Sequence, residues 1–398
     1  MKPNQIYQVI NLVNKQYWGK NAVQVTDLSG LIALGESFSV GDNDADGYLG
    51  ALVDRIGKTR IRTLDLELQF PRLFRDTFTF GAMLQKISVN PYDAIANSDY
   101  NVGNDGFTPT LLDAPRKPSI NVNYFKGGDT WAYRVEVPED MFFTAFTNET
   151  AMANFLDAIL KALTDSMTMA INSMSRACIN NFIAEKIKAG NGIVNLLTLY
   201  NATLAQADQI TADAALTDKG FLRFAGMIMR NYIGYLNDPT SMYNTAGYIR
   251  QTQRDNLNVY MLRDFVSAYT TYYSADTFNQ QMASLPGYKE LTAWQGSNSI
   301  ASGITLKNAP DFTTNSTINI IPSSEISKEV AERVAINQSG IIAAFIDREA
   351  VAVGLDKRRV GKFYNPMDNI VSTKTSALIQ FINDTTENGV VFMVADVS

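Results

Sequence analysis

The chain contains no histidine and only one cysteine, and each shortage excludes a kind of chemistry. Histidine is the commonest general base and the commonest transition-metal ligand in proteins. Its absence argues against zinc hydrolases and against catalytic triads that need an imidazole. Cys178 has no second thiol to pair with, so we expect a buried free thiol and a reducing cytoplasm. We therefore predict that the chain is not an enzyme and has no catalytic, cofactor-binding or metal-ligating residues.

Long apolar runs, an export signal and an excess of positive charge are also missing. Residues 341–346 are apolar, but charged residues follow at 347–349, far short of the roughly 18 residues that a membrane helix needs. The first 19 residues lack the charged-then-apolar order of a signal peptide, so no export is expected. A net charge of -6 argues against electrostatic binding of nucleic acid along the whole chain, because such binding needs a positively charged face. With 46% hydrophobic residues, the 398-residue chain should fold into two or three units.

What the sequence does contain is one very long amphipathic helix between residues 147 and 190. Its apolar residues recur at alternating steps of three and four, which keeps them on one face. Thr147 or Asn148 can cap its start, and Gly190 tolerates a left-handed stop. We call residues 148–189 the spine helix; at a rise of about 1.5 Å per residue it is on the order of 60 Å long. The apolar face comprises Met152, Phe155, Leu156, Ile159, Leu160, Leu163, Met167, Ala170, Ile171, Met174, Cys178 and Phe182. The opposite face is polar and is expected to be exposed to solvent; it comprises Asn154, Asp157, Lys161, Asp165, Thr168, Asn172, Arg176 and Lys186.

The residues before the spine helix predict two short helices, an arm and an extension. Residues 4–17 and 49–56 have helical spacing, and the stretch between them is predicted to be an extended arm without packing. Alternation with period two predicts strands at 60–70, 119–124 and 131–137, the last two joined by a turn at Gly127 and Gly128. No local helix can cover these strands, so their apolar side must meet another surface.

The residues after the spine helix predict a compact α/β unit followed by closing strands. We expect the spine helix to cover the closing strands, which makes the fold α+β and its core discontinuous in sequence. The predicted elements are a strand at 192–200, helices at 217–238, at 256–273 and from 275, strands at 304–306 and 318–321, a charged helix at 323–335, and strands at 341–353, 370–382 and 390–397.

Three short motifs suggest ligands but have plainer interpretations. Residues 42–47 match the first half of a calcium loop, but Val53 stands where a bidentate glutamate is needed, so an acidic helix cap is favoured. Residues 190–195 imitate a dinucleotide loop but follow a helix, which favours a helix stop. Glu325, Glu329 and Glu332 could be clustered acids, but Lys328 with Glu332 and Glu329 with Arg333 are i, i+4 pairs, the pattern of a solvated helix face.

Two further groups suggest nucleic acid. Residues 356–359 with Lys362 form the densest basic patch and are predicted to be a turn between strands. They could touch phosphate, but ion pairs with a neighbouring subunit are favoured. The second group is aromatic and lies near Arg254 and Arg263; it could stack on single strands, but its helical spacing favours core packing. It comprises Tyr260, Phe265, Tyr269, Tyr272, Tyr273 and Phe278.

The order of these parts resembles that of the major capsid proteins of tailed bacteriophages with the Hong Kong-type fold, most closely those of small short-tailed phages (podoviruses). Residues 52–57, the run 346–349 and the passage from 370–372 to Val394 carry the resemblance. It implies an N-terminal arm with short helices at 1–59, an extended two-stranded loop at 60–137, and an axial domain at 201–336. Residues 138–200 with 337–398 would form the peripheral domain around the spine helix.

The resemblance implies a structural subunit that assembles into an icosahedral shell around packaged double-stranded DNA. Its partners would be copies of itself in pentamers and hexamers, scaffolding and portal proteins, and DNA through non-specific contact. Assembly would take place in the host cytoplasm and the product would be the virion capsid, with no membrane involved. Two alternatives remain: an encapsulin-like cellular nanocompartment of the same fold, and a non-viral surface or interaction protein.

Overall fold

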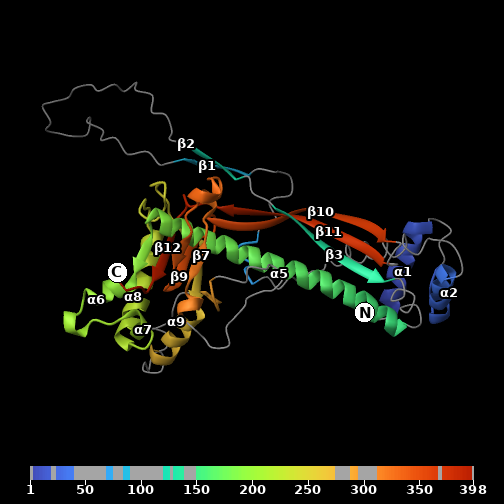
Figure 1. The fold of residues 1–398 in the computed structure, drawn as a ribbon, viewed down its shortest axis with the longest axis horizontal. Coiled ribbons are helices and arrows are strands. Elements are labelled where there is room, and N and C mark those ends of the chain that lie inside the picture. Colours follow the sequence, from blue (N-terminus) through green and yellow to red (C-terminus); the bar gives the residue numbers. More distant parts are fainter. Residues whose placement is uncertain are drawn as a thin grey trace, which may run out of the picture.

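The computed structural model describes residues 3–18, 24–39, 69–74, 84–89, 120–125, 129–138, 149–273, 287–294, 312–365 and 370–396. Its longest element is α5 (Glu149–Ala189), which runs along the molecule (Figure 1). The N-terminal helices lie near the start of α5, and helices α6, α8 and α9 gather around its end (Figure 1). Among these residues no helix combines the length and the apolar character that crossing a membrane requires.

Helix α5 confirms the predicted spine helix and its stop. Gly190 has φ 65°, and its N–H donates to the Ile187 carbonyl at 3.1 Å, which closes the last turn. Gly192 also has a positive φ, and a Cβ there would lie 2.4 Å from the Gly389 carbonyl oxygen. Residues 190–195 are thus a helix stop that lets the chain enter a sheet beside Gly389, as predicted.

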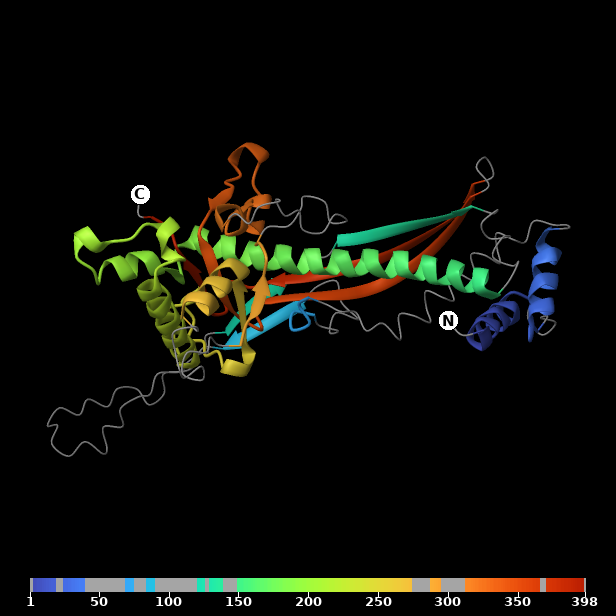
Figure 2. The same ribbon diagram turned by 90° about the horizontal axis from the view of Figure 1, so that it is seen from below.

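Two sheets pack against α5. The first is antiparallel with the order β10-β11-β3 and lies alongside α5 in both views (Figure 2). The second has the order β4-β12-β9-β5-β6, in which the β12–β4 and β5–β6 pairs are parallel and the others antiparallel. Four of the eight strands come from the end of the chain, and α5 contacts three of them, β10, β11 and β12, so the expected cover of the closing strands by the spine helix is confirmed. The strands are β3 (Asp129–Pro138), β4 (Ile193–Asn195), β5 (Leu257–Leu262), β6 (Lys289–Leu291), β9 (Ile341–Asp347), β10 (Val351–Asn365), β11 (Ile370–Asn383) and β12 (Gly389–Met393).

The five-stranded sheet is sandwiched between α5 and α8 (Lys219–Asn237). Alternate side chains of β5 enter different cores: Tyr260 and Leu262 pack with Phe182 of α5. Val259 and Met261 pack with the buried face of α8. Because both faces of β5 and β9 are covered, every residue of these two strands is buried. Neither strand therefore shows the period-two pattern by which a half-buried strand is recognised.

This burial explains the first of the following three errors in the second half of the chain. The helix predicted at 256–273 is wrong in its first part, which is β5; α9 (Arg263–Ala268) and a π-helical turn (Tyr269–Tyr273) follow. The strand predicted at 341–353 is two strands, because Asp347 forms a turn by accepting the Glu349 N–H at 2.8 Å. The strand predicted at 192–200 is only β4, and Asn195 then caps α6 (Leu196–Asn201).

Other predicted elements are confirmed or shortened. Helix α8 confirms the helix predicted from Thr217, with Asp218 as its N-cap, and strand β11 confirms 370–382. The charged helix at 323–335 is wrong: it is reduced to α11 (Ser323–Ile326) and a single turn at Val330–Glu332. Strand β7 (Ile318–Ile320) confirms the strand predicted at 318–321 and pairs with β8 (Ile336–Gln338). The remaining short elements are helices α7 (Ala212–Ala215) and α10 (Phe312–Asn315) and 3-10 turns at Gln206–Asp208 and Arg254–Asn256. Residues 275–286 and 304–306 lie outside the described residues.

The N-terminal region is more ordered than its sequence suggests. Helix α1 (Pro3–Trp18) confirms the first predicted helix, but α2 (Leu28–Ser39) stands where an extended arm was predicted. Asp27 accepts the Gly30 N–H at 2.8 Å and so caps α2, whose Leu31 and Leu34 are buried. Two glycines and three serines within α2 weaken its helical signal. Residues 40–68, with the predicted helix at 49–56, most of the strand at 60–70 and the acidic loop at 42–47, lie outside the described residues.

In the second half of the spine helix, other parts of the chain cover the polar face. Residues 69–74 and 287–294 cross that face, and the polar side chains bond to their backbone. Arg176 donates to the Ala293 carbonyl and Asn180 to the Trp294 carbonyl, each at 2.6 Å, and Asn172 accepts the Gln69 N–H at 2.9 Å. Burial lowers the pKa of Arg176 to about 10. The prediction that Arg176 and Lys186 face solvent is therefore wrong, because a second layer of chain covers the helix.

A charge on the buried apolar stripe of α5 should prevent folding. Ile171 is buried, and I171D would place an unpaired carboxylate there at a cost of about 3 kcal/mol or more. N172D keeps the acceptor that bonds the Gln69 N–H and should change stability by less than about 1 kcal/mol. Thermal unfolding of both purified variants measures the difference. Equal losses would show that the two faces of α5 are assigned wrongly.

Candidate assembly interface

A two-stranded ribbon forms a sheet of its own, apart from the two large sheets. It consists of β1 (Leu84–Val89) and β2 (Ile120–Phe125), paired antiparallel (Figure 1). Strand β2 confirms the strand predicted at 119–124, whereas β1 was not predicted. Sequence alternation had predicted a β2–β3 hairpin, and this pairing is wrong: β3 pairs with β11 instead. Residues 127–128, the predicted turn, lie outside the described residues.

One face of the ribbon is apolar and points to solvent. The register pairs Val89 with Ile120 and Ile87 with Val122, so these side chains share a face with Tyr124. The exposed fractions are 61% for Ile87, 51% for Val89, 55% for Ile120 and 61% for Tyr124. Large apolar side chains gathered on one exposed face mark an interaction surface.

The opposite face of the ribbon is mainly polar and points to the body. Lys86 donates to Asp384 at 2.9 Å and forms an ion pair with Glu387 at 2.8 Å. Asn123, which pairs with Lys86 across the ribbon, donates to the Thr386 hydroxyl at 3.2 Å. Phe125 adds an apolar contact, at Ala352 and Ile382. The ribbon is thus held by polar bonds to the turn between β11 and β12.

We call Lys86, Arg250, Asp384 and Glu387 the anchor cluster. Arg250 approaches Glu387 at 3.4 Å, and only 11% of the Glu387 side chain is exposed. Burial acts to lower the pKa of Lys86, but Asp384 and Glu387 outweigh it, so the pKa is raised. Burial raises the pKa of Glu387 despite its two cationic partners. Lys86 is the member of the cluster that belongs to the ribbon, so its ion pairs with Asp384 and Glu387 hold the ribbon against the body.

Lys186 of α5 lies fully buried next to this cluster. Its ammonium donates to the Tyr243 carbonyl at 2.6 Å and lies 5.5 Å from the centre of the Phe182 ring. Burial lowers the pKa of Lys186 to about 7, although the negative charge of Asp384 opposes the shift. A lysine with one carbonyl acceptor and a distant carboxylate is only partly compensated for the loss of water.

The family of the chain follows from its match to a family model. Residues 8–393 match the model of the Phi29-like phage major capsid protein. The chain belongs to this family. It is a phage major capsid protein, a component of the virion that assembles with copies of itself into the icosahedral shell. The predicted resemblance and the prediction of a structural, non-enzymatic protein are confirmed, and the nanocompartment alternative is not supported.

Two solved structures share the fold of this capsid protein. A chain in the capsid structure of Staphylococcus phage Andhra matches with a TM-score of 0.52 at 12% identity, over 84% of this chain and 86% of that chain. A chain in the structure of the head fibre and inner core protein gp22 of bacteriophage P68 matches with a TM-score of 0.50 at 10% identity, over 82% and 84%. No curated protein matches. The likeness extends over most of each chain and shows the α+β capsid fold.

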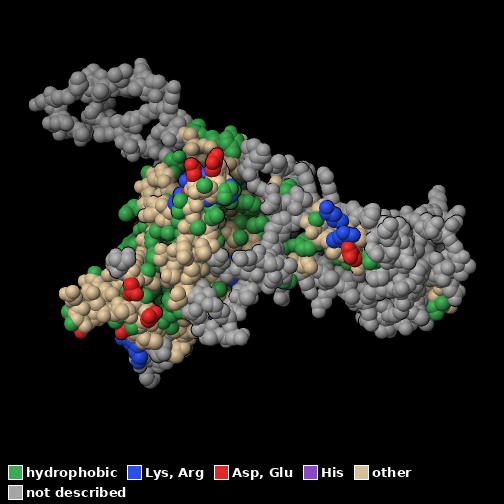
Figure 3. Space-filling model, viewed as in Figure 1, with side chains coloured by type: hydrophobic (Ala, Val, Ile, Leu, Met, Phe, Trp, Pro, Cys, Tyr) green, Lys and Arg blue, Asp and Glu red, His purple; other side chains and the backbone are tan. Residues whose placement is uncertain are grey.

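The motifs singled out in the sequence of this capsid protein are dispersed. The aromatic group packs in the core at Tyr260, Phe265 and Tyr269, as favoured. The basic patch at 356–359 is not a turn but part of β10, at a shift of register. In the described part of the chain, no three acidic or cysteine side chains are grouped to hold a metal. On the face in Figure 3, charged side chains form only small groups.

Glu325 does not lie on a solvated helix face. Its side chain is buried and pairs with Lys188 of α5 and, at 2.9 Å, with Lys328. Bonds to these lysines lower the pKa of Glu325 to about 2. Glu185 of α5 also accepts the Ser324 N–H at 2.7 Å. Residues 323–326 are therefore bound to the end of α5, an interaction that no local charge pattern indicated.

The buried ammonium of Lys186 should make subunit stability depend on pH. Between about pH 7 and 10.5 the unfolded chain holds this proton and the folded chain has lost it, so unfolding free energy rises with pH, by at most about 1.4 kcal/mol per unit. K186M lacks the ammonium that loses this proton, so its unfolding free energy should change less with pH. Denaturant unfolding of unassembled wild type and K186M at pH 6.5 to 9 measures this. Parallel profiles would refute the assigned burial.

Proposed function

We propose that the ribbon β1–β2 binds a neighbouring subunit through its exposed apolar face and that this contact joins pentamers and hexamers of the shell. The observation that carries the proposal is the inverted polarity of the ribbon. A strand pair that served only the monomer would bury its apolar face and leave its polar face in water. Here the polar face contacts the body and the apolar face is free.

The free energy of burying the apolar face of the ribbon is too small to hold two subunits together without other contacts. A fully buried large apolar side chain contributes about 1.5 to 3 kcal/mol, so the four half-exposed ones contribute only a few kcal/mol together. Association costs about 4 to 15 kcal/mol. The ribbon must therefore act with further contacts, as in obligate interfaces of roughly 2,000 to 5,000 Å². Each subunit would give one ribbon and receive another, and such heterologous contacts close into a shell when the curvature fits.

The anchor cluster supports this role by fixing the direction of the ribbon before assembly. Lys86 and Asn123 on the polar face bond to residues 384–387, so the ribbon need not be ordered again when it meets a partner. Preorganisation of this kind lowers the entropic cost of association. The cluster also leaves the apolar face uncovered by the subunit's own body.

In the proposed organisation residues 1–59 form the N-terminal arm with short helices and 60–137 the extended loop that carries the ribbon. Residues 138–200 with 337–398 form the peripheral domain, and 201–336 form the axial domain near the five-fold and six-fold centres. The packing of α5 on β10 and β11 supports the peripheral unit. Strand β3 pairs with β11 and would join the extended loop to that unit.

We also propose that the shell packages double-stranded DNA and is assembled with scaffolding and portal proteins in the host cytoplasm. The net charge of -6 supports only loose, non-specific contact with DNA, because tight binding of phosphates needs clustered positive charge. Loose contact lets packaged DNA slide along the inner surface during filling.

A charge on the apolar face of the ribbon should block assembly without unfolding the subunit. Ile87 is 61% exposed, so I87D costs the monomer little, but it would bury a carboxylate in the interface. The subunit concentration needed for assembly should rise by about tenfold or more, which corresponds to about 1.4 kcal/mol per contact. Sedimentation velocity measures the fraction in shells, and thermal unfolding confirms the fold.

I87V is the matched control, since it keeps the apolar contact and should assemble nearly as wild type does. If I87D assembles at the wild-type concentration, the ribbon face does not lie in the interface. If I87D fails to unfold cooperatively, the face belongs to the core of the subunit itself.

A further inference from the structure

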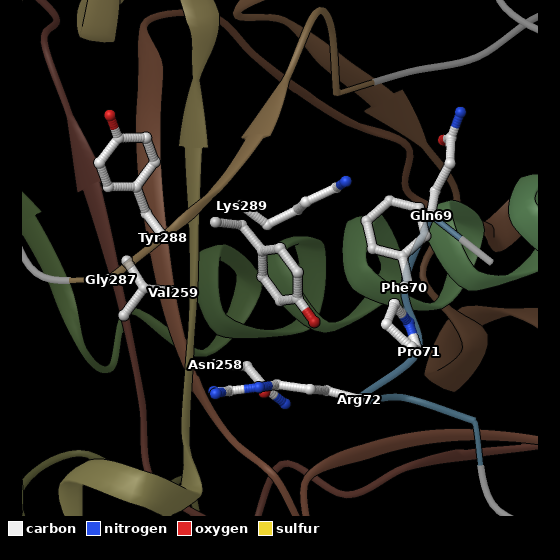
Figure 4. A pocket seen from close by; sticks show the side chains of 10 residues that line it. Gln69, Phe70, Pro71, Arg72, Asn258, Val259, Gly287, Tyr288 and Lys289 are labelled. Carbon is white, nitrogen blue, oxygen red and sulfur yellow. The ribbon is translucent and has the colours of Figure 1, made fainter. Parts of the chain in front are cut away.

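A pocket opens where residues 69–72 cross the edge of the five-stranded sheet. It has a volume of about 440 Å³ and lies on the α5 side of β5 (Figure 4). Asn258 and Tyr260 are two residues apart on this strand, so both side chains face the pocket. Residues 287–289, which lead into β6, form the second wall and residues 69–72 the third. The pocket is distinct from the ribbon and from the anchor cluster.

The lining carries two cations and no carboxylate. Arg72 comes from one wall and Lys289 from the opposite one (Figure 4). Neither forms an ion pair with the residues that the structure describes. Glu290, the acidic neighbour of Lys289, approaches Arg263 at 3.7 Å instead. The side-chain carbonyl of Gln69 is already used, because it accepts from Arg176 at 3.5 Å. The pocket therefore has a surplus of positive charge and of hydrogen-bond donors.

A buried donor without a partner points into the same space. Asn258 is only 3% exposed, and within the described residues its Nδ2 atom has no hydrogen-bond acceptor. A buried amide left unpaired costs about 1 to 3 kcal/mol, so such groups are rare unless a ligand satisfies them. Burial also raises the pKa of Tyr260, so its hydroxyl stays protonated and is able to donate. The Phe70 ring packs edge-on against Tyr260, with centroids 5.9 Å apart, and holds the wall in place.

We propose that this pocket binds an oxyanion, a carboxylate or a phosphate group, held by Arg72, Lys289 and the amide of Asn258. Guanidinium and ammonium groups match both anions, and the amide supplies a bond from a fixed direction. A cation is excluded as the ligand because the lining has no carboxylate. The oxyanion comes either from solution or from an acidic group of a neighbouring subunit in the shell.

Inorganic phosphate is the probe for an anion from solution. Isothermal titration of the unassembled full chain, with ionic strength held constant by sodium chloride, should show one saturable site. R72Q and K289Q should each weaken this binding by at least tenfold. R230Q removes an exposed arginine of α8 outside the pocket and is the matched control; it should bind phosphate as wild type does.

N258D tests, without any added ligand, whether the pocket stabilises an acidic group. It places a carboxylate of the same size where the unpaired amide lies. At neutral pH the unfolding midpoint should rise by about 2 °C or more, because Arg72 and Lys289 gain a partner. The same substitution in the R72Q background should lose that gain, and N258D should abolish phosphate binding.

Phosphate binding that depends on Arg72 and Lys289 supports an anion from solution. A stabilising N258D without phosphate binding supports an acidic group from a neighbouring subunit. The proposal is overturned if N258D lowers the midpoint and phosphate either does not bind or binds equally well to R72Q, K289Q and wild type. Neither phosphate binding nor the unfolding midpoint depends on the contacts of the ribbon, so these results are independent of the assembly test.

Discussion

Contacts along one helix, α5, determine where the other parts of this capsid protein lie. Its apolar stripe packs on the five-stranded sheet, and its length lies along the β10-β11-β3 sheet. Each of these sheets combines strands from the end of the chain with at least one strand from much earlier, β3 in one sheet and β4 in the other, so neither sheet is completed early in the chain. A helix of 41 residues can span both sheets, whereas the average globular helix of about 11 to 12 residues cannot. Without α5 the two sheets would have no common support.

This position also explains why α5 buries polar groups that a surface helix would leave in water. Arg176 and Asn180 each bond a carbonyl of the covering chain at 2.6 Å, so their donors are satisfied and the chain that follows β6 is fixed against α5. Lys186 is the exception, since one carbonyl and a distant Asp384 compensate it only in part. The second half of α5 is therefore fixed by contacts on both faces, and we expect the stability of the subunit to respond to pH near neutrality.

Amphipathic periods predicted several elements whose apolar residues recur on one face, and they misassigned β5, both of whose faces are buried. Helix α8, strand β2 and the length of α5 were predicted correctly because their apolar residues recur with a regular period along the sequence. Strand β5 was assigned to a helix because both of its faces are buried, and apolar runs of that kind fit either element. The pairing of Lys86 with Asp384 joins positions 298 residues apart, so no local pattern could reveal it. The pocket at Asn258 depends on the same kind of long-range contact.

The ribbon shows how a single subunit keeps folding and assembly apart. If its apolar face were turned inward, the free monomer would bury that area alone and nothing would remain to drive association. A polar inward face needs exact partners, and the anchor cluster supplies them at Lys86, Asp384 and Glu387. Such charge pairs add little net stability, because desolvation offsets most of their attraction, but they specify geometry. In the proposed interface the ribbon is aimed at a neighbouring subunit, and the free energy of burying its apolar surface is gained only when the shell forms.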